Sequence, residues 1–160
     1  MTPATHSRSS RTVLQRGVTL IELVVVLLVV GVLASLAVPT FRAQVLAANR
    51  TDAREALLAL ATAQEKFYLA CNTYTSLLDP DRESSCDPPS LRFATRSQRG
   101  LYTITVEAAD VGGWTARATV ASDTPQAADR ACEVFELDST GLRTALMTAG
   151  TSARVDCWAR

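Results

Sequence analysis

The sequence predicts an α+β fold, in which a long N-terminal α-helix packs on a four-stranded antiparallel β-sheet. Residues 18–38 are apolar and residues 39–71 are amphipathic and rich in alanine, which together indicate one long helix. From residue 101 onward, short segments rich in β-branched and aromatic residues alternate with turn residues, as is typical of an antiparallel meander. A chain of 160 residues supports one modest domain plus such an attached element.

The first half of this helix has the length of a membrane span. Val18–Val38 reads VTLIELVVVLLVVGVLASLAV, and Glu22 is its only charged residue. As a helix it spans about 30 Å, the thickness of the hydrocarbon core of a bilayer. Three arginines and no acidic residue precede it: Arg8, Arg11 and Arg16. The positive-inside rule therefore keeps residues 1–17 in the cytoplasm and sends the rest across the membrane.

The remaining segments divide by composition. Residues 39–71 are expected to form the amphipathic half of the helix, and the turn-rich residues 72–100 a connecting loop region. Residues 101–160 are expected to form the sheet and a C-terminal region bounded by a disulfide. The expected strands are residues 101–107, 114–120, 132–137 and 142–147.

Charge and composition exclude several classes of function. After residues 1–17, which we call the leader, the chain carries 13 basic against 16 acidic residues. The arginines are scattered among acidic residues, so no nucleic-acid partner is predicted. The only histidine, His6, lies in the leader, and there is no C-x-x-C pair, nucleophile elbow or glycine-rich phosphate loop. We therefore expect no catalytic residue, no metal and no cofactor. The acidic run at residues 79–83 is interpreted as a solvated face.

Four cysteines follow the apolar segment: Cys71, Cys86, Cys132 and Cys157. An even number of widely spaced cysteines beyond a membrane-targeting segment favours disulfides formed in an oxidising compartment. Cys71 and Cys86 enclose 14 residues, and neighbours in sequence meet most easily, so this pair is expected to be bonded.

Two features set the apolar segment apart from a simple anchor. Gly17 directly precedes it, at a place where an ordinary signal peptidase does not cut, although Ala34–Ala37 could imitate such a site. Glu22 places a carboxylate near the start of a membrane helix, which costs a few kcal/mol (about 3) unless it finds a partner. The most available partner is a positive N-terminus on a neighbouring copy, which exists only if the chain is cut just upstream.

The motif GVTLIEL at residues 17–23, with a basic residue before it and an apolar run after it, resembles the class III signal of type IV prepilins and pseudopilins. The resemblance implies that prepilin peptidase cleaves between Gly17 and Val18 and that Val18 is N-methylated. It also implies that Glu22 neutralises the N-terminus of an adjacent subunit during assembly. The family usually has phenylalanine or methionine where this chain has Val18, and aliphatic residues are tolerated there.

Gly31 and Pro39 interrupt the apolar pattern. Glycine weakens a helix interior and proline removes a backbone hydrogen bond, yet both are common in membrane helices. The family resemblance implies that the stretch between them extends locally when subunits pack in a filament.

The C-terminal stretch carries a second resemblance. RACEVFELDSTGLRT followed by DCW resembles PilE-type minor pilins, and a Cys132–Cys157 bridge matches the disulfide-bounded region of type IVa pilins. The resemblance implies the type IV pilin fold and a structural role as a minor pilin in adhesion, twitching motility or DNA uptake. The implied partners are prepilin peptidase, other pilin subunits, the inner membrane and the assembly platform. The head would lie in the periplasm before assembly and on a surface pilus after it.

Two alternatives remain at this point. A type II secretion pseudopilin uses the same signal, but such proteins usually lack the C-terminal disulfide and often hold calcium in that region. A single-pass inner-membrane protein with a periplasmic binding domain would keep residues 1–17 or lose them to ordinary signal peptidase.

Overall fold

The computed structural model describes residues 18–147 and 157–159, and the chain divides into two compact units between Thr40 and Phe41. The helix α1 (Leu20–Cys71) contributes to both units, and all strands belong to the second, which we call the head. The remaining elements are β1 (Ser85–Cys86), β2 (Pro89–Ser90), β3 (Tyr102–Ala109), β4 (Trp114–Val120), the 3₁₀ helix η1 (Pro125–Ala128), β5 (Val134–Asp138) and β6 (Arg143–Leu146). The expected α+β class is confirmed.

Both ends of α1 carry recognisable caps. At the start, the Thr19 hydroxyl accepts a hydrogen bond from the backbone N–H of Glu22, at 3.3 Å, which satisfies a donor that has no partner within the helix. At the end, Asn72 has a positive φ of 54°, and its N–H donates to the carbonyl of Tyr68 at 2.8 Å. Asparagine is among the few residues that adopt this left-handed conformation readily, so the helix ends at Cys71.

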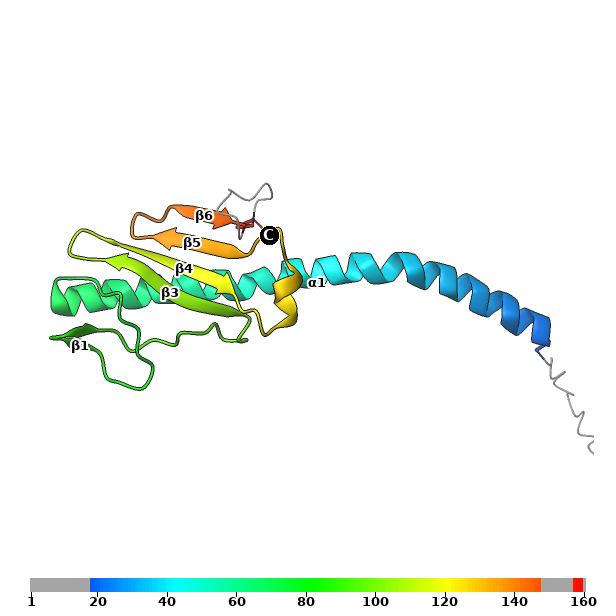
Figure 1. Cartoon of the computed structure of the whole chain (residues 1–160), viewed down its shortest axis with the longest axis horizontal. Coiled ribbons are helices and arrows are strands. Elements are labelled where there is room, and N and C mark those ends of the chain that lie inside the picture. The colour runs from blue at the N-terminus through cyan, green and yellow to red at the C-terminus, as the bar shows by residue number, and fades with distance from the viewer. Residues whose placement is uncertain (1–17, 148–156, 160) are drawn as a thin grey trace, which may run out of the picture. The chain divides into compact units, whose positions relative to one another are not determined.

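The four-stranded sheet is an antiparallel meander in the order β3-β4-β5-β6 (Figure 1). Its register pairs Thr103 with Thr119, Arg117 with Glu136, and Glu136 with Thr144. A bulge between Val106 and Ala108 interrupts the β3–β4 ladder and carries β3 two residues further than the alternation predicts. Short turns join β3 to β4 and β5 to β6, whereas residues 121–133, which include η1, connect β4 to β5.

The β5–β6 hairpin depends on one carboxylate. Oδ1 of Asp138 accepts hydrogen bonds from the Thr140 hydroxyl at 2.6 Å and from the N–H groups of Thr140 and Leu142 at 2.8 and 3.0 Å. The hydroxyl bond in particular lowers the pKa of Asp138, with the backbone donors adding to the effect. Gly141, at φ 85°, takes the left-handed position that this turn requires.

The core forms where the second half of α1 lies against one face of the sheet (Figure 1). The helix buries a stripe at helical spacing: Ala53, Leu57, Leu60, Gln64 and Phe67. The strands bury alternate residues: Tyr102, Ile104 and Val106 on β3, Trp114, Ala116 and Ala118 on β4, and Phe135 and Leu137 on β5. The alanines of β4 leave room for the larger helix side chains, because interiors are packed to near-crystalline density.

A buried polar cluster ties α1 to η1. Arg50 donates to both carboxylate oxygens of Asp129, at 2.7 and 2.9 Å, and Gln126 donates to the Leu46 carbonyl and the Tyr102 hydroxyl. The bond to Asp129 raises the pKa of Arg50, and burial raises the pKa of the Tyr102 hydroxyl. The cluster therefore holds a charged pair and a neutral phenol together at the edge of the core.

A second buried carboxylate holds the loop before β3. Asp52, on α1, accepts from the Ser97 hydroxyl at 2.6 Å and from the backbone N–H of Arg99 at 3.1 Å. The Ser97 hydroxyl oxygen in turn accepts from the N–H of Tyr102, the first residue of β3. The helix thereby positions the start of the sheet through side-chain bonds that hydrophobic patterning does not reveal.

The loop between α1 and the sheet is more ordered than the turn-rich sequence suggests. Cys71 is bonded to Cys86, which lies in the small β1–β2 hairpin. Gln64 donates to the Thr75 carbonyl at 2.6 Å, and the Thr75 hydroxyl donates to the Pro89 carbonyl at 2.8 Å. Buried amide and hydroxyl groups need such partners, and these bonds fix the loop against the last turns of the helix.

The C-terminal residues return to the sheet beside β5 and β6. Cys157 is bonded to Cys132, and Trp158 packs edge-to-face on Phe135 with ring centroids 5.7 Å apart. The Trp158 indole N–H donates to the Thr144 carbonyl at 2.7 Å. The end of the chain thus closes one side of the core.

We predict that Arg50→Met destabilises the head by about 3 kcal/mol, because it leaves the buried Asp129 carboxylate without its counter-charge while keeping the apolar stem. Urea unfolding of the detergent-solubilised full chain measures the change. The control is Arg92→Met, since the Arg92–Glu83 pair is exposed and its loss should cost less than about 1 kcal/mol. Equal losses in the two variants would contradict the role given to burial.

We also predict that Trp158→Phe costs about 1 kcal/mol more than its hydrophobic area explains, because the Thr144 carbonyl loses a donor. Trp114→Phe is the matched control: it removes the same ring area, but the buried Trp114 indole N–H donates to none of the residues that the structure describes. Both variants should lower the midpoint of urea unfolding through lost ring area. Only the Trp158 variant should lower it further, through the lost hydrogen bond. A second substitution at Thr144 should not restore the midpoint, because the acceptor is its backbone carbonyl and not its side chain.

Candidate functional site

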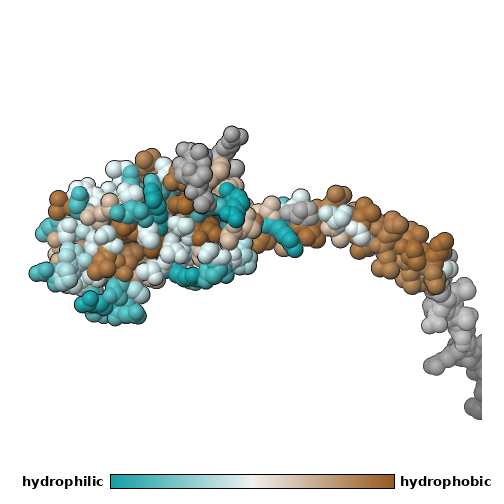
Figure 2. Space-filling model, viewed as in Figure 1, coloured by the Kyte–Doolittle hydropathy of each residue, from teal (hydrophilic) through white to brown (hydrophobic). Residues whose placement is uncertain are grey.

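The apolar first part of α1 is exposed along its whole length. Its large side chains, from Leu20 to Val38, are between 49% and 80% exposed, and Figure 2 shows them as a continuous hydrophobic surface. Within the described residues, α1 is the one helix long and apolar enough to cross a membrane, with a window of mean hydropathy 2.9 of which none is buried. A contiguous apolar surface of this size is typical of a segment that contacts lipid or other proteins.

Glu22 is the only ionisable side chain on this surface. It lies in the first turn of α1, where the N–H groups without helical partners favour a negative charge. Its backbone N–H bonds to Thr19, so Thr19 and Glu22 have the spacing of a capping box. The helix therefore supplies a local reason for glutamate at this position, in addition to any contact with another molecule.

Gly31 and Pro39 both lie within α1, which continues through them. A Cβ built on Gly31 meets nothing within 4 Å, so no packing among the described residues requires a glycine there. Proline lacks an N–H, which leaves the carbonyl of Ser35 without its usual helical donor. Nearby hydroxyls donate to other carbonyls: Ser35 to Val32 at 2.7 Å and Thr40 to Ala37 at 2.8 Å.

The expected cleavage point falls at the edge of what the structure describes. Val18 is exposed just before α1, whereas Gly17 and the rest of the leader lie outside the described residues. The four cysteines expected to form disulfides are brought together in two pairs, Cys71 with Cys86 and Cys132 with Cys157. These bonds lie in the head, far along the chain from Glu22.

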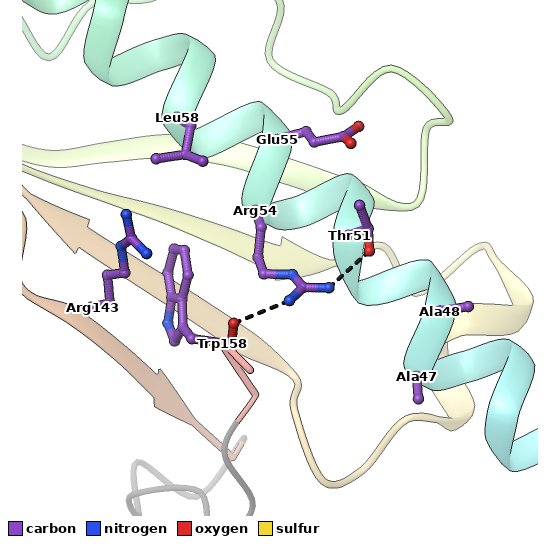
Figure 3. Close-up of a pocket in the computed structure, with 8 residues that line it drawn as sticks. All are labelled: Ala47, Ala48, Thr51, Arg54, Glu55, Leu58, Arg143 and Trp158. Carbon is purple, nitrogen blue, oxygen red and sulfur yellow. Dashed lines mark hydrogen bonds between the residues drawn. The ribbon is translucent and has the colours of Figure 1, made fainter. Parts of the chain in front are cut away.

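The head has a hollow of about 650 Å³ between α1 and the C-terminal residues (Figure 3). Its lining combines apolar and charged side chains: Ala47, Ala48, Thr51, Arg54, Glu55, Leu58, Arg143 and Trp158. Arg54 donates to the carbonyl of Trp158 at 3.0 Å and to the hydroxyl of Thr51 at 2.8 Å. The guanidinium of Arg143 lies over the Trp158 ring, 5.5 Å from its centroid.

Sequence reasoning missed this hollow. Arg54 on α1 and Arg143 on β6 are 89 positions apart along the chain and are brought together by the packing of the sheet on the helix. Trp158 reaches the hollow beside Cys157, which is bonded to Cys132. The available signal was a tryptophan directly after the last cysteine, since an indole next to a disulfide usually packs on the core.

Six of the ten arginines that the structure describes in the head are neutralised within it. Six bond to a carboxylate: Arg50, Arg82, Arg92, Arg96, Arg117 and Arg130. The acidic run expected to be a solvated face includes Asp79, which lies 3.9 Å from Arg82. Across residues 18–147 and 157–159, no group of three or more His, Cys, Asp or Glu side chains is placed to hold a metal ion.

Comparisons with known proteins agree with this arrangement. A family model described as "Type IV minor pilin ComP, DNA uptake sequence receptor" matches residues 39–136, and one described as "Prokaryotic N-terminal methylation motif" matches residues 14–38. The type IV major pilin protein PilA of Myxococcus xanthus (strain DK1622) is 38% identical over 60 residues, which are 38% of this chain and 27% of PilA. The resemblance to type IV pilins is confirmed, and the chain belongs to the type IV minor pilin family.

Proposed function

We propose that this chain is a minor subunit of a type IV pilus that is assembled through its N-terminal helix. The observation that carries the proposal is the exposed apolar surface from Leu20 to Val38, joined to a head that has a core of its own. Such a surface is stable in lipid or against other apolar helices, and not in water. A membrane-bound precursor provides the first environment and a filament of pilins provides the second.

Processing precedes assembly in this proposal. Prepilin peptidase cuts between Gly17 and Val18, and Val18 is then N-methylated. Support comes from the methylation motif, which matches residues 14–38, and from the position of Val18 immediately before the helix cap at Thr19. Before assembly the helix crosses the inner membrane with its head in the periplasm, an orientation supported by the arginines that precede the span.

Glu22 selects and aligns the incoming subunit. A single carboxylate on an apolar surface is costly in a bilayer until it meets a positive charge, so assembly relieves that cost. The new amine of Val18 on an adjacent subunit supplies the charge. The cap at Thr19 leaves the Glu22 side chain available for this contact, because the bond uses the backbone N–H and not the carboxylate.

Gly31 and Pro39 adapt the helix to its neighbours. The Gly31 position has open space and the Pro39 position lacks a backbone donor, so the intervening turns resist extension less than the rest of α1. We propose that this stretch extends locally in the filament. The role of the chain is structural, contributing to assembly and through it to adhesion or twitching motility.

DNA uptake is a second candidate function. It is favoured by the family description, which names a DNA uptake sequence receptor and covers residues 39–136. The sequence itself predicts no surface dedicated to nucleic acid, and six arginines of the head are paired with carboxylates. DNA phosphates would therefore have to replace those carboxylates, or to bind the Lys and Arg side chains that are not paired with a carboxylate.

For processing, we predict that the protein isolated from membranes begins with methylated Val18. Intact mass and N-terminal sequencing measure this directly. An intact Met1, or a start after Ala37, would identify instead a single-pass membrane protein with a periplasmic binding domain.

For assembly, we predict that Glu22→Gln leaves cleavage unchanged but lowers incorporation into sheared surface filaments at least about tenfold, because the charge pair is lost in an apolar surrounding. The control, Glu65→Gln, is exposed on the head half of α1. Quantitative blotting of sheared and membrane fractions gives the ratio. Absence of the unmodified chain from sheared filaments, with loss of protein secretion on deletion, would favour the pseudopilin alternative.

For DNA uptake, we predict that the full chain in detergent binds duplex DNA with an affinity that falls steeply as salt rises, because phosphate contacts release counterions. Fluorescence anisotropy with a labelled duplex at several salt concentrations measures the slope. Competition between duplexes of different sequence separates base recognition from charge alone. Lack of salt-dependent binding would leave the pilus role standing without a DNA receptor function.

A further inference from the structure

A filament requires two different surfaces on each subunit, because a head-to-tail contact that does not close on itself joins unlike patches. One surface is already identified: the exposed apolar segment Leu20–Val38, with Glu22 as its only charge. The other surface must be apolar, and a cation on it that no carboxylate of its own molecule neutralises could share Glu22 with the Val18 amine. The need for this second surface rests on the proposed pilus role.

The ion pairs of the head narrow the choice of cation. With six arginines bound to carboxylates, five cationic residues among those described have no carboxylate partner: Arg42, Arg54, Lys66, Arg99 and Arg143. Arg99 donates to the side-chain oxygen of Asn49, at 2.8 Å. Arg54 and Arg143 share one hollow, and its walls include the apolar side chains of Ala48, Leu58 and Trp158.

The two arginines of the hollow differ in how their N–H groups are used. Arg54 is half-buried and donates to the carbonyls of Trp158 and Ala159 and to the Thr51 hydroxyl, so it braces the chain end against α1. Arg143 is exposed, its guanidinium carbon lies over the Trp158 ring 5.5 Å from the centroid, and no carboxylate of the described residues binds its N–H groups. Figure 3 shows the Trp158 ring between Arg143 and Arg54. Arg143 is therefore the residue that can donate to an incoming carboxylate.

The helix side of the hollow suits a second helix. Ala47, Ala48 and Thr51 lie within one turn of each other, and their small side chains permit the axes of two helices to approach to about 8–10 Å. Leu58 and the indole of Trp158 extend the apolar wall. Glu55 also lines the hollow, but the two arginines outnumber it, so the local charge is positive.

We propose that this hollow receives the N-terminal helix of a neighbouring pilin subunit, and that Arg143 pairs with the glutamate in its first turn. The partner is defined by its chemistry: an apolar helix with a single carboxylate near its start, as in Leu20–Val38 with Glu22 of this chain. A carboxylate has two oxygens, so it can bond a guanidinium and the terminal amine of another subunit together. Arg143 thus becomes a docking residue of the head.

Arg42 is the rival cation. It lies on α1 just after the apolar segment, near the exposed side chains of Phe41 and Val45, but it does not line the hollow. A neighbouring helix held by Arg42 would run beside the exposed surface of α1 and would not touch Leu58 or Trp158. The two arrangements therefore differ in which head residues contact the helix.

Photo-cross-linking in assembled filaments tests the contact. A benzoylphenylalanine replaces Leu58, which is 44% exposed on the wall of the hollow, or Val111, which is 69% exposed at the β3–β4 turn and serves as control. We expect Leu58 to cross-link to the N-terminal tryptic peptide of a pilin subunit, Val18–Arg42 where the neighbour is another copy. Cross-links from Leu58 only to other peptides, in filaments that contain the chain, would overturn the proposal.

Charge variants test the cation. We expect Arg143→Gln to lower incorporation into sheared filaments about tenfold and to abolish the Leu58 cross-link, whereas Arg92→Gln, at an exposed ion pair, leaves both unchanged. Protease resistance of the membrane-bound head checks that each variant is folded. Unchanged incorporation of Arg143→Gln, or loss in Arg42→Gln alone, would overturn the proposal. If Glu22→Gln is not incorporated into filaments while Arg143→Gln is incorporated normally, the pilus role stands and only the Arg143 contact is wrong. If the unmodified chain never enters filaments, the pilus role itself is wrong.

Discussion

One helix must be stable in two different surroundings, and the rest of the molecule depends on that constraint. The residues of α1 before Thr40 are apolar on every side, so they need lipid or other helices around them. Those after Phe41 bury a stripe that includes Leu57 and Leu60, and the sheet covers that stripe. The head therefore buries one face of the second half of the helix in its core, while the first half stays available for partners.

Hydrophobic burial alone does not position the head on the helix. Two carboxylates, Asp52 and Asp129, receive donors from the loop before β3 and from Arg50, and the amide of Gln64 holds the loop after the helix. These bonds are directional, whereas apolar contact permits sliding along the stripe. The buried polar groups consequently determine which turn of α1 faces which strand.

Much of this fold could be predicted from the sequence, because its main elements depend on local periodicity. The alternation at residues 114–120 matches β4 to the residue, and the cap at Asn72 agrees with a helix that ends at Cys71. The β1–β2 hairpin and η1 were missed, since elements of two to four residues exist only through partners such as the Pro89 carbonyl and the Gln126 side chain. The hollow was missed for the same reason: no local pattern reports that Arg54 and Trp158 meet.

The disulfide between Cys71 and Cys86 has a mechanical consequence. Cys71 is the last residue of α1, so a pull on the β1–β2 hairpin passes through a covalent bond directly into the helix axis. The Cys132–Cys157 bond likewise fastens the chain end to the start of the β5 segment. Load applied to the Cys71–Cys86 loop thus bypasses the hydrogen bonds of the sheet and reaches the helix through covalent bonds alone.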